Sequence, residues 1–180
     1  AGVAALMLAL NASLTPDEIE SRLKSTARAF PASCSGCGSG IVDAAAAVAA
    51  ATAPVAQPVT LAESESNNTI ATADPVSTSN TTVSGNMGST SDSDYFRVDL
   101  PAGKTLSATL TPGTTSADYD LFVYNASGTQ LAKSENGAGQ ADSTSVSNTG
   151  SAVSARYVRV VYYSGGTGAT NGRYTLKLNW

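Results

Sequence analysis

The chain has 180 residues, a net charge of −4, and only 13% charged residues. An acidic, sparsely charged chain lacks the basic surface that nucleic acids require, and no apolar stretch is long enough to cross a membrane, so neither partner is expected. The chain contains no histidine, which excludes a Ser-His-Asp or Cys-His nucleophile and any imidazole metal ligand formed from its own residues.

The first part of the chain, residues 1–51, is predicted to be helical. It begins with AGVAALMLAL, which has none of the Ser, Thr, Asp or Asn residues that usually cap a helix. We therefore expect that Ala1 is not a native N-terminus. A second helix is predicted to start after Thr15, because the next residue is proline and Glu18 completes a capping box. Asp43 is expected to cap a third helix, AAAAVAAA.

The second part of the chain is predicted to consist of strands. Two prolines in residues 52–60 indicate a linker, and residues 61–180 follow it. Apolar and polar residues alternate between turns in DYFRVDL, TLSATL, DYDLFVYNASGTQLA, RYVRVVYY and RYTLKLNW. A hairpin turn is expected at residues 125–128. Short alternating strands without helices between them predict a mainly β domain, an antiparallel β-sandwich.

Three segments of the first part occur in a characteristic order: AGVAALMLAL, LTPDEIESRLKSTA and GSGIVDAAAAV. They resemble the last part of a subtilisin-like serine protease catalytic domain. Ala1 and Gly2 match the end of the family motif GTSMAxPHVAG, so the resemblance implies that the catalytic Ser lies upstream of this chain. The resemblance implies that the catalytic Asp and His lie upstream as well. The parent protein is thus expected to be a serine endopeptidase, and this chain alone is expected to be inactive.

The second part contains SDSDYFRVDLPAGKTLSATL, ADYDLFVYNASGTQLA and ARYVRVVYYSGGTGATNGRYTLKL. These segments resemble the pre-peptidase C-terminal (PPC) domain, a β-sandwich found behind secreted proteases. The resemblance implies a PPC-like, jelly-roll-type sandwich preceded by a helical remnant of an α/β catalytic domain. Together the two resemblances imply the C-terminal fragment of a secreted, extracellular protease precursor. Its PPC domain would aid secretion, maturation or substrate binding.

Two kinds of partner follow from this interpretation: the rest of the catalytic domain, and an insoluble protein substrate. The alternative is a stand-alone extracellular module that binds a collagen-like protein or a polysaccharide. Six aromatic residues could form a platform for such a polymer, although part of this set is expected in the core. They are Tyr119, Tyr124, Tyr162, Tyr163, Tyr174 and Trp180.

The only cysteines, Cys34 and Cys37, form the motif CSGC. A redox pair would need a helix N-terminus and a βαβ context, and a zinc site would need further ligands. We therefore predict a local disulfide that fixes the loop before the third helix.

Oxygen-bearing side chains in ESESNN and SDSD suggest a calcium site, because calcium takes six to eight oxygen ligands. The pattern resembles the calcium site of the related collagen-binding domains of bacterial collagenases, although Asn68 stands where Asp is usual. An acidic, solvated edge is the alternative. The candidate ligands are Glu63, Glu65, Asn67, Asn68, Asp92 and Asp94.

A further carboxylate pair, Asp118 and Asp120, is expected on one face of a strand because the residues are two positions apart. Such a pair could serve glycoside hydrolysis. The alternative is that both side chains bond to loop backbone or to solvent.

Overall fold

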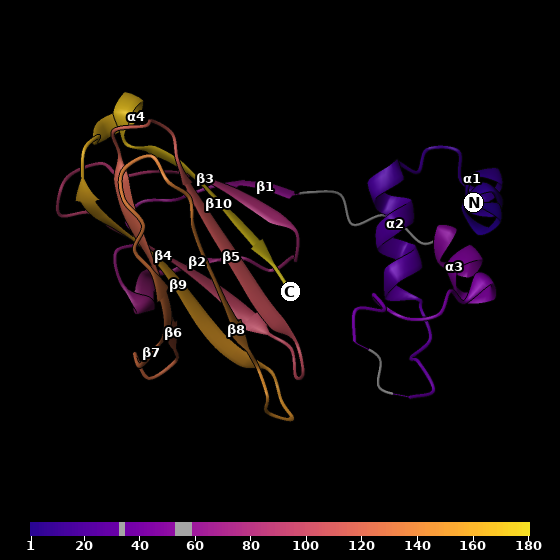
Figure 1. The fold of residues 1–180 in the computed structure, drawn as a ribbon. Coiled ribbons are helices and arrows are strands. Elements are labelled where there is room, and N and C mark those ends of the chain that lie inside the picture. The colour runs from indigo at the N-terminus through magenta and orange to yellow at the C-terminus, as the bar shows by residue number, and fades with distance from the viewer. Residues whose placement is uncertain (33–34, 53–58) are drawn as a thin grey trace. The chain divides into compact units, whose positions relative to one another are not determined.

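The computed structural model describes residues 1–32, 35–52 and 59–180, and the chain divides into two units, residues 1–55 and 56–180. The first unit is helical and the second is built of strands (Figure 1). Among the described residues, no helix is both long and apolar enough to cross a membrane.

The helical unit contains α1 (Gly2–Leu10), α2 (Pro16–Ser25) and α3 (Ala44–Ala51). The predicted caps are confirmed. Thr15 and Glu18 form the capping box of α2, and the Asp43 side chain accepts a hydrogen bond from the backbone N–H of Ala46 at the start of α3. No side chain caps α1.

The core of the helical unit is small. Its buried hydrophobic residues are Met7, Leu14, Ala47 and Ala51. The side chain of Asn11 donates a hydrogen bond to the carbonyl of Ala51 at 3.2 Å and so joins the end of α1 to the end of α3. The predicted Cys34–Cys37 disulfide stays a prediction, because Cys34 lies outside the described residues.

The second unit is a sandwich of two five-stranded sheets (Figure 1). The first sheet has the order β1-β3-β10-β5-β8 and the second β2-β4-β9-β6-β7. The strands are β1 (Val59–Ala62), β2 (Asp74–Pro75), β3 (Thr81–Asn86), β4 (Ser93–Leu100), β5 (Thr105–Pro112), β6 (Asp118–Asn125), β7 (Gln130–Ser134), β8 (Asp142–Ser147), β9 (Ser154–Ser164) and β10 (Arg173–Asn179).

This architecture confirms the predicted mainly β sandwich. Most neighbouring strands are antiparallel, but β1 pairs with β3 and β2 with β4 in parallel. The predicted turn is present, since the Gly128 N–H donates to the Asn125 carbonyl at 3.0 Å. Residues 53–58 of the predicted linker lie outside the described residues, while Val59 and Thr60 already belong to β1.

Four elements had no clear pattern in the sequence. Strands β3 and β8 are rich in Ser and Thr, and their places are set by the register with β10 and β5. The short helix α4 (Gly168–Asn171) and the 3-10 turn η1 (Ile70–Thr72) lie in connections rich in small residues. Pairing with neighbouring strands, rather than apolar alternation, defines β3 and β8.

The sandwich core is formed by the inward positions of both sheets. Phe96, Leu110, Tyr119 and Leu176 are among its fully or almost fully buried side chains. Inward and outward residues alternate along β5 and β10, as expected for strands with one buried and one solvated face. This packing fixes the positions from which the candidate site is built.

Candidate metal centre

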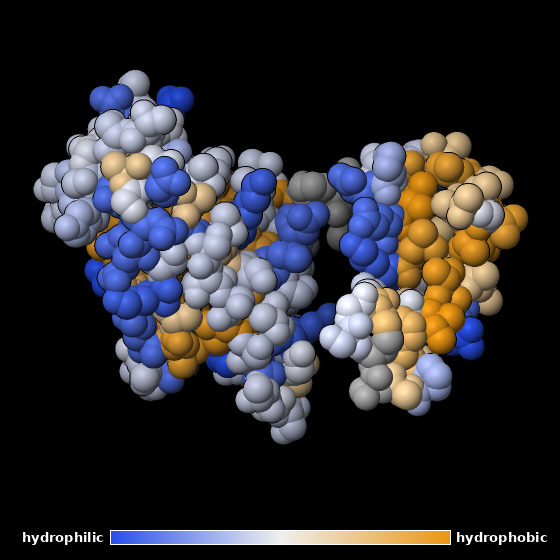
Figure 2. Space-filling model, viewed as in Figure 1, coloured by the Kyte–Doolittle hydropathy of each residue, from blue (hydrophilic) through white to orange (hydrophobic). Residues whose placement is uncertain are grey.

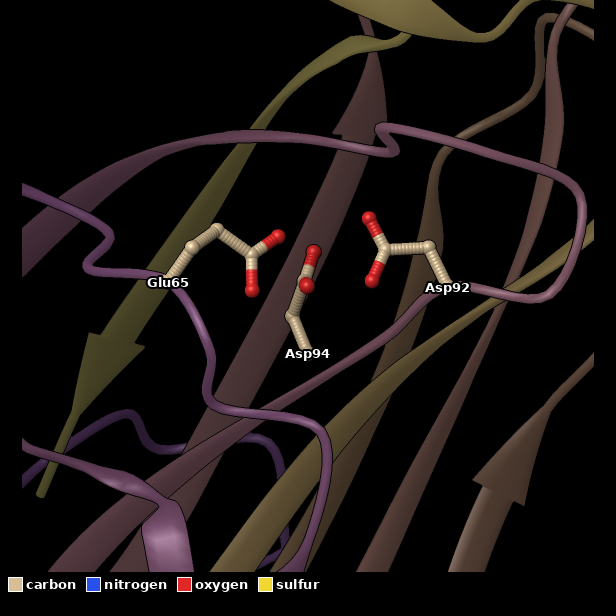
Figure 3. A group of neighbouring side chains, drawn as sticks. All are labelled: Glu65, Asp92 and Asp94. Atoms are coloured by element: carbon tan, nitrogen blue, oxygen red, sulfur yellow. The ribbon is translucent and has the colours of Figure 1, made fainter.

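Three carboxylates of the sandwich lie together, as the sequence pattern suggested. Each of Glu65, Asp92 and Asp94 has one oxygen within 4.8 Å of an oxygen of the other two. Figure 3 shows the three side chains pointing toward one another. The structure thus brings together two segments of the chain that the sequence leaves far apart.

Two strands position these carboxylates. Asp94 lies at the second position of β4, directly after Asp92 and Ser93. The other side of the site follows β1, where the N–H of Glu63 continues the pairing with β3 by donating to the carbonyl of Ser84 at 3.1 Å. Since β1 and β4 belong to different sheets, residues from both sheets meet at the site.

Asp94 is fully buried, and its carboxylate contacts a tyrosine. The hydroxyl of Tyr174 lies 2.6 Å from Asp94 Oδ2 and 2.9 Å from Glu63 Oε2. Burial raises the pKa of Asp94 to about 9, and the charges of Glu63 and Asp92 act in the same direction. Burial also raises the pKa of Glu63, although hydrogen bonds from Tyr174 and from the N–H of Asn86 oppose this change.

Two buried oxygens of the site have no hydrogen-bond partner among the described residues: Asp94 Oδ1 and Asn67 Oδ1. Asn67 is fully buried, and its amide nitrogen lies 3.4 Å from Asp74 Oδ2. A buried oxygen without a partner is costly, and native structures contain few of them. Both oxygens are of the kind that a hard cation binds.

The carboxylate of Asp92 is held by neighbouring amide groups. Its Oδ2 accepts from the N–H of Gly88 at 2.6 Å, and its Oδ1 accepts from the N–H of Ser93 at 2.9 Å. When the Asn68 amide is oriented to pair donors with acceptors, its nitrogen lies 2.8 Å from Asp92 Oδ1 and 3.0 Å from the Ser93 carbonyl. Without a cation, Asn68 therefore supports Asp92 as a donor.

Sequence reasoning missed two residues of this site, Asp74 and Gly85, and assigned a third, Tyr174, to an aromatic platform. Asp74 accepts from the N–H of Ser64 at 2.7 Å and so fixes the backbone between Glu63 and Glu65. Gly85 makes room for Tyr174, because a Cβ at this position would lie 2.0 Å from the tyrosine ring. A glycine facing a tyrosine on a neighbouring strand gives no local signal in a sequence.

Comparison with known proteins matches part of the sandwich to one family. Residues 92–178 match the family described as the bacterial pre-peptidase C-terminal (PPC) domain. The match begins at Asp92, so it includes Asp92 and Asp94, while the other four candidate ligands precede it.

A separate comparison concerns only part of the chain. An "Extracellular protease" of Xanthomonas campestris pv. campestris is 57% identical over 53 residues. This segment covers 28% of the present chain and 9% of that protein. The chain therefore matches only a small part of the curated relative.

Comparison with solved structures finds the PPC domain of a collagenase from Bacillus anthracis. That comparison has a TM-score of 0.47 and 14% identity, and it covers 59% of this chain and 94% of the other. Aeromonas hydrophila PliG, a periplasmic inhibitor of g-type lysozyme, gives a TM-score of 0.37 and 12% identity, with 68% and 99% of the two chains covered.

The predicted aromatic platform is not assembled as proposed. Tyr119 and Tyr174 are buried in the core of the sandwich, and Tyr162 and Trp180 pack against that core. Tyr163 is 70% exposed. The expectation that part of the set belongs to the core is confirmed, and the six residues do not form one surface.

A different aromatic cluster lies on the second sheet. The rings of Tyr95 and Phe122 each have their centroid 6.3 Å from that of Tyr124. Arg159 lies between Tyr95 and Phe122 in the strand register, and its guanidinium is 5.3 Å from the centroid of Tyr95. The outward alternation of β4 and β6 could have indicated this cluster, because its aromatic residues occupy outward positions.

Proposed function

We propose that the chain is the C-terminal part of a secreted, subtilisin-like serine endopeptidase precursor. In this proposal residues 1–51 close the catalytic domain, and the PPC domain is an extracellular accessory module. The chain has no histidine, so the general base of the reaction must come from another part of the longer protein. The isolated chain is accordingly proposed to be inactive.

The observation that carries this proposal is the unsatisfied apolar surface of α1. Leu6 and Leu10 are 57% and 54% exposed, whereas only Met7 of this helix is buried. Figure 2 shows hydrophobic residues gathered over the helical unit. A helix that is apolar on all sides is typical of the interior of a larger domain. Part of the chain is similar to an extracellular protease, and this similarity supports a protease catalytic domain as the larger domain that surrounds α1.

The role of the helical unit is therefore to complete the packing around a helix of the catalytic domain. It supplies α3, which already covers one side of α1 through Met7, Ala47 and Ala51, and α2, which packs against α3. The remaining sides would be covered by the sheet of the catalytic domain. Burial of a leucine side chain contributes about 1.5–3 kcal/mol, so an exposed α1 represents a large unused contribution to stability.

The experiment compares two matched substitutions, Leu6→Asp in α1 and Val153→Asp in the sandwich, at side chains that are 57% and 63% exposed. In the isolated chain both should be tolerated. In the longer protein encoded by the same gene, Leu6→Asp should abolish secreted peptidase activity, and Val153→Asp should not. Full activity of the Leu6→Asp protein would refute the proposal.

We also propose that the metal centre binds calcium. The donor set supports this proposal, because it consists of carboxylate and amide oxygens from Glu63, Glu65, Asn67, Asn68, Asp92 and Asp94. A bound calcium would offset the mutual repulsion of the carboxylates and connect the segment after β1 to the start of β4. Calorimetric titration of the full chain should detect calcium binding, and Asp94→Asn should abolish it.

A second candidate function is binding of an insoluble polymer, and the cluster of Tyr95, Phe122 and Tyr124 supports it. Aromatic rings on an open sheet can contact an extended protein or the apolar faces of sugar rings. Sedimentation of the chain with insoluble collagen and with cellulose tests this function. Tyr124→Ala should reduce co-sedimentation, whereas Leu131→Ala, an exposed position on β7, should not.

A further inference from the structure

A second group of carboxylates surrounds a hollow at the other end of β6 from the hairpin turn. The hollow has a volume of about 420 Å³ and is lined by Asp118, Asp120, Glu135, Asn136, Gly137 and Tyr163. Asp118 and Asp120 belong to β6, and Tyr163 belongs to β9. The pairing of β6 and β9 shifts register between Asp118 and Tyr119. Asp118 lies opposite Ser164 and Tyr119 opposite Tyr162, so Tyr163 falls at the shift. Asp118 and Asp120 both line the hollow, which is consistent with the expectation that they lie on one face of β6.

Among the residues that line the hollow, Asp118 combines low exposure with a lack of described hydrogen-bond partners. Its side chain is only 7% exposed, and it makes no hydrogen bond with any described residue. Of the two partners expected in the alternative interpretation, loop backbone makes no described bond to the Asp118 side chain, which leaves solvent. The carboxylate oxygens of Asp118 have no donor among the described residues and open onto the hollow, where they are available to a ligand.

Asp142 increases the negative charge behind the hollow. Its Oδ1 accepts from Ser134 Oγ at 2.6 Å and from the N–H of Asn136 at 2.8 Å. Its Oδ2 is buried and has no partner among the described residues. Burial raises the pKa of Asp118, and the charge of Asp142 adds to this effect.

Lys133 does not neutralise this group. Its ammonium forms an ion pair with Glu135, and the two side chains are about half exposed. Burial nevertheless raises the pKa of Asp120 to about 6, and the charges of Asp118, Glu135 and Asp142 act in the same direction against the weaker opposite effect of Lys133. The hollow thus has a negative potential that its own residues leave uncompensated.

The arrangement fits an organic cation better than a metal ion. Among the described residues, only Glu65, Asp92 and Asp94 bring three acidic ligand atoms within 4.8 Å of one another, so the carboxylates of the hollow do not converge on one point. They are distributed around a space that also contains an aromatic ring, Tyr163, which is 70% exposed. A guanidinium group has several donors in one plane and binds both to carboxylates and to the face of an aromatic ring.

We propose that this hollow binds the side chain of an arginine in a polypeptide partner. Asp118 and Asp120 accept hydrogen bonds from the guanidinium, and Tyr163 provides an aromatic surface for it. The site is separate from the candidate calcium centre and shares no residue with it. Its function would be to recognise a basic position in a protein that contacts the PPC domain.

The test is a titration of the full, ¹⁵N-labelled chain with N-acetyl-arginine amide, followed by NMR. The control ligand is N-acetyl-citrulline amide, which has a similar shape but no charge. Arginine amide should shift the amide signals of residues 118–120, 135–137 and 163, and citrulline amide should bind at least about tenfold more weakly. Equal binding of both ligands, or shifts confined to other residues, would overturn the proposal.

Variants assign the contacts. Asp118→Asn should weaken arginine binding about tenfold, and Asp120→Asn provides the same test if the first variant does not fold. Asp99→Asn removes a carboxylate of the same sheet outside the hollow and should change affinity less than twofold. Tyr163→Phe should retain binding, while Tyr163→Ala should reduce it about threefold. If the carboxylate variants bind like the wild type, or if calcium alone shifts the same signals, the assignment is wrong.

Discussion

The two units of the chain differ in how completely each one buries its own hydrophobic residues. In the sandwich, Phe96, Leu110 and Leu176 are fully buried between two sheets. In the helical unit, Leu6 and Leu10 remain more than half exposed although they lie on the same helix as the buried Met7. Strands that alternate inward and outward residues can close a core with one partner sheet, whereas a helix that is apolar all round needs neighbours on every side.

The largest expected consequence concerns amide hydrogen exchange. Amides of α1, α2 and α3 should exchange quickly, because few buried contacts oppose local opening. Amides of β4, β6, β9 and β10 should open only with a free energy near that of global unfolding, about 5 kcal/mol or more. Mass spectrometry of exchanged peptides measures the difference. Equal, strong protection in both units would show that the helical unit is stable by itself.

Truncation of buried side chains should show the same contrast. Leu176→Ala should lower the free energy of unfolding of the sandwich by about 2–5 kcal/mol, because a fully buried leucine leaves a cavity. Met7→Ala removes an equally buried side chain from the helical unit. The melting temperature of the sandwich should then stay unchanged within about 1 °C. A large effect of Met7→Ala on this transition would mean that the two units unfold together.

The sequence predicted the parts of the fold that depend on local pattern. The capping box of Thr15 and Glu18 and the turn at Asn125 and Gly128 involve residues three positions apart, and both are confirmed. Strand β8 was not predicted, because its sequence DSTSVS has one large apolar residue, and its position depends on pairing with β5. Register between distant strands is a tertiary property.

The candidate site shows the same limit. Alternating oxygen ligands predicted that Glu65, Asp92 and Asp94 belong together, and the structure places them within 4.8 Å. The hydrogen bonds of Tyr174 to Asp94 and Glu63 could not be predicted, since they depend on β10 lying beside β3 and on the space at Gly85. Tyr174 instead resembled a surface aromatic, because its neighbours in the sequence are polar.

Calcium should sharpen the contrast further by stabilising the sandwich alone. Binding restricted to the folded state contributes about 2.7 kcal/mol when free calcium is a hundredfold above the dissociation constant. The melting temperature of the sandwich should therefore be higher in millimolar calcium than in chelator, and the exchange of α1 to α3 should not change. Asp94→Asn should remove the increase, and Asp99→Asn should retain it. Identical melting in both buffers would show that this cluster of carboxylates does not bind calcium.

The smallest expected effect concerns pH and the hollow beside Asp120. The pKa of Asp120 is raised to about 6, chiefly by burial and then by Asp118, Glu135 and Asp142. A carboxyl group with a pKa raised in the folded state favours folding when it is protonated, and this contribution is lost as the pH increases from about 4 through 6.

In the Asp120→Asn variant, residue 120 is uncharged at every pH. The free energy of folding of this variant therefore does not change with pH through this residue. Relative to the wild type, its melting temperature should therefore increase by about 1–3 °C between pH 4 and pH 7.5, a small change because Asp120 is partly exposed and solvent screens its charge. Thermal melts in chelator measure this difference, with Asp99→Asn as the matched control. A difference that is constant over this range, or that changes in the opposite direction, would show that the hollow does not destabilise the ionised carboxylate.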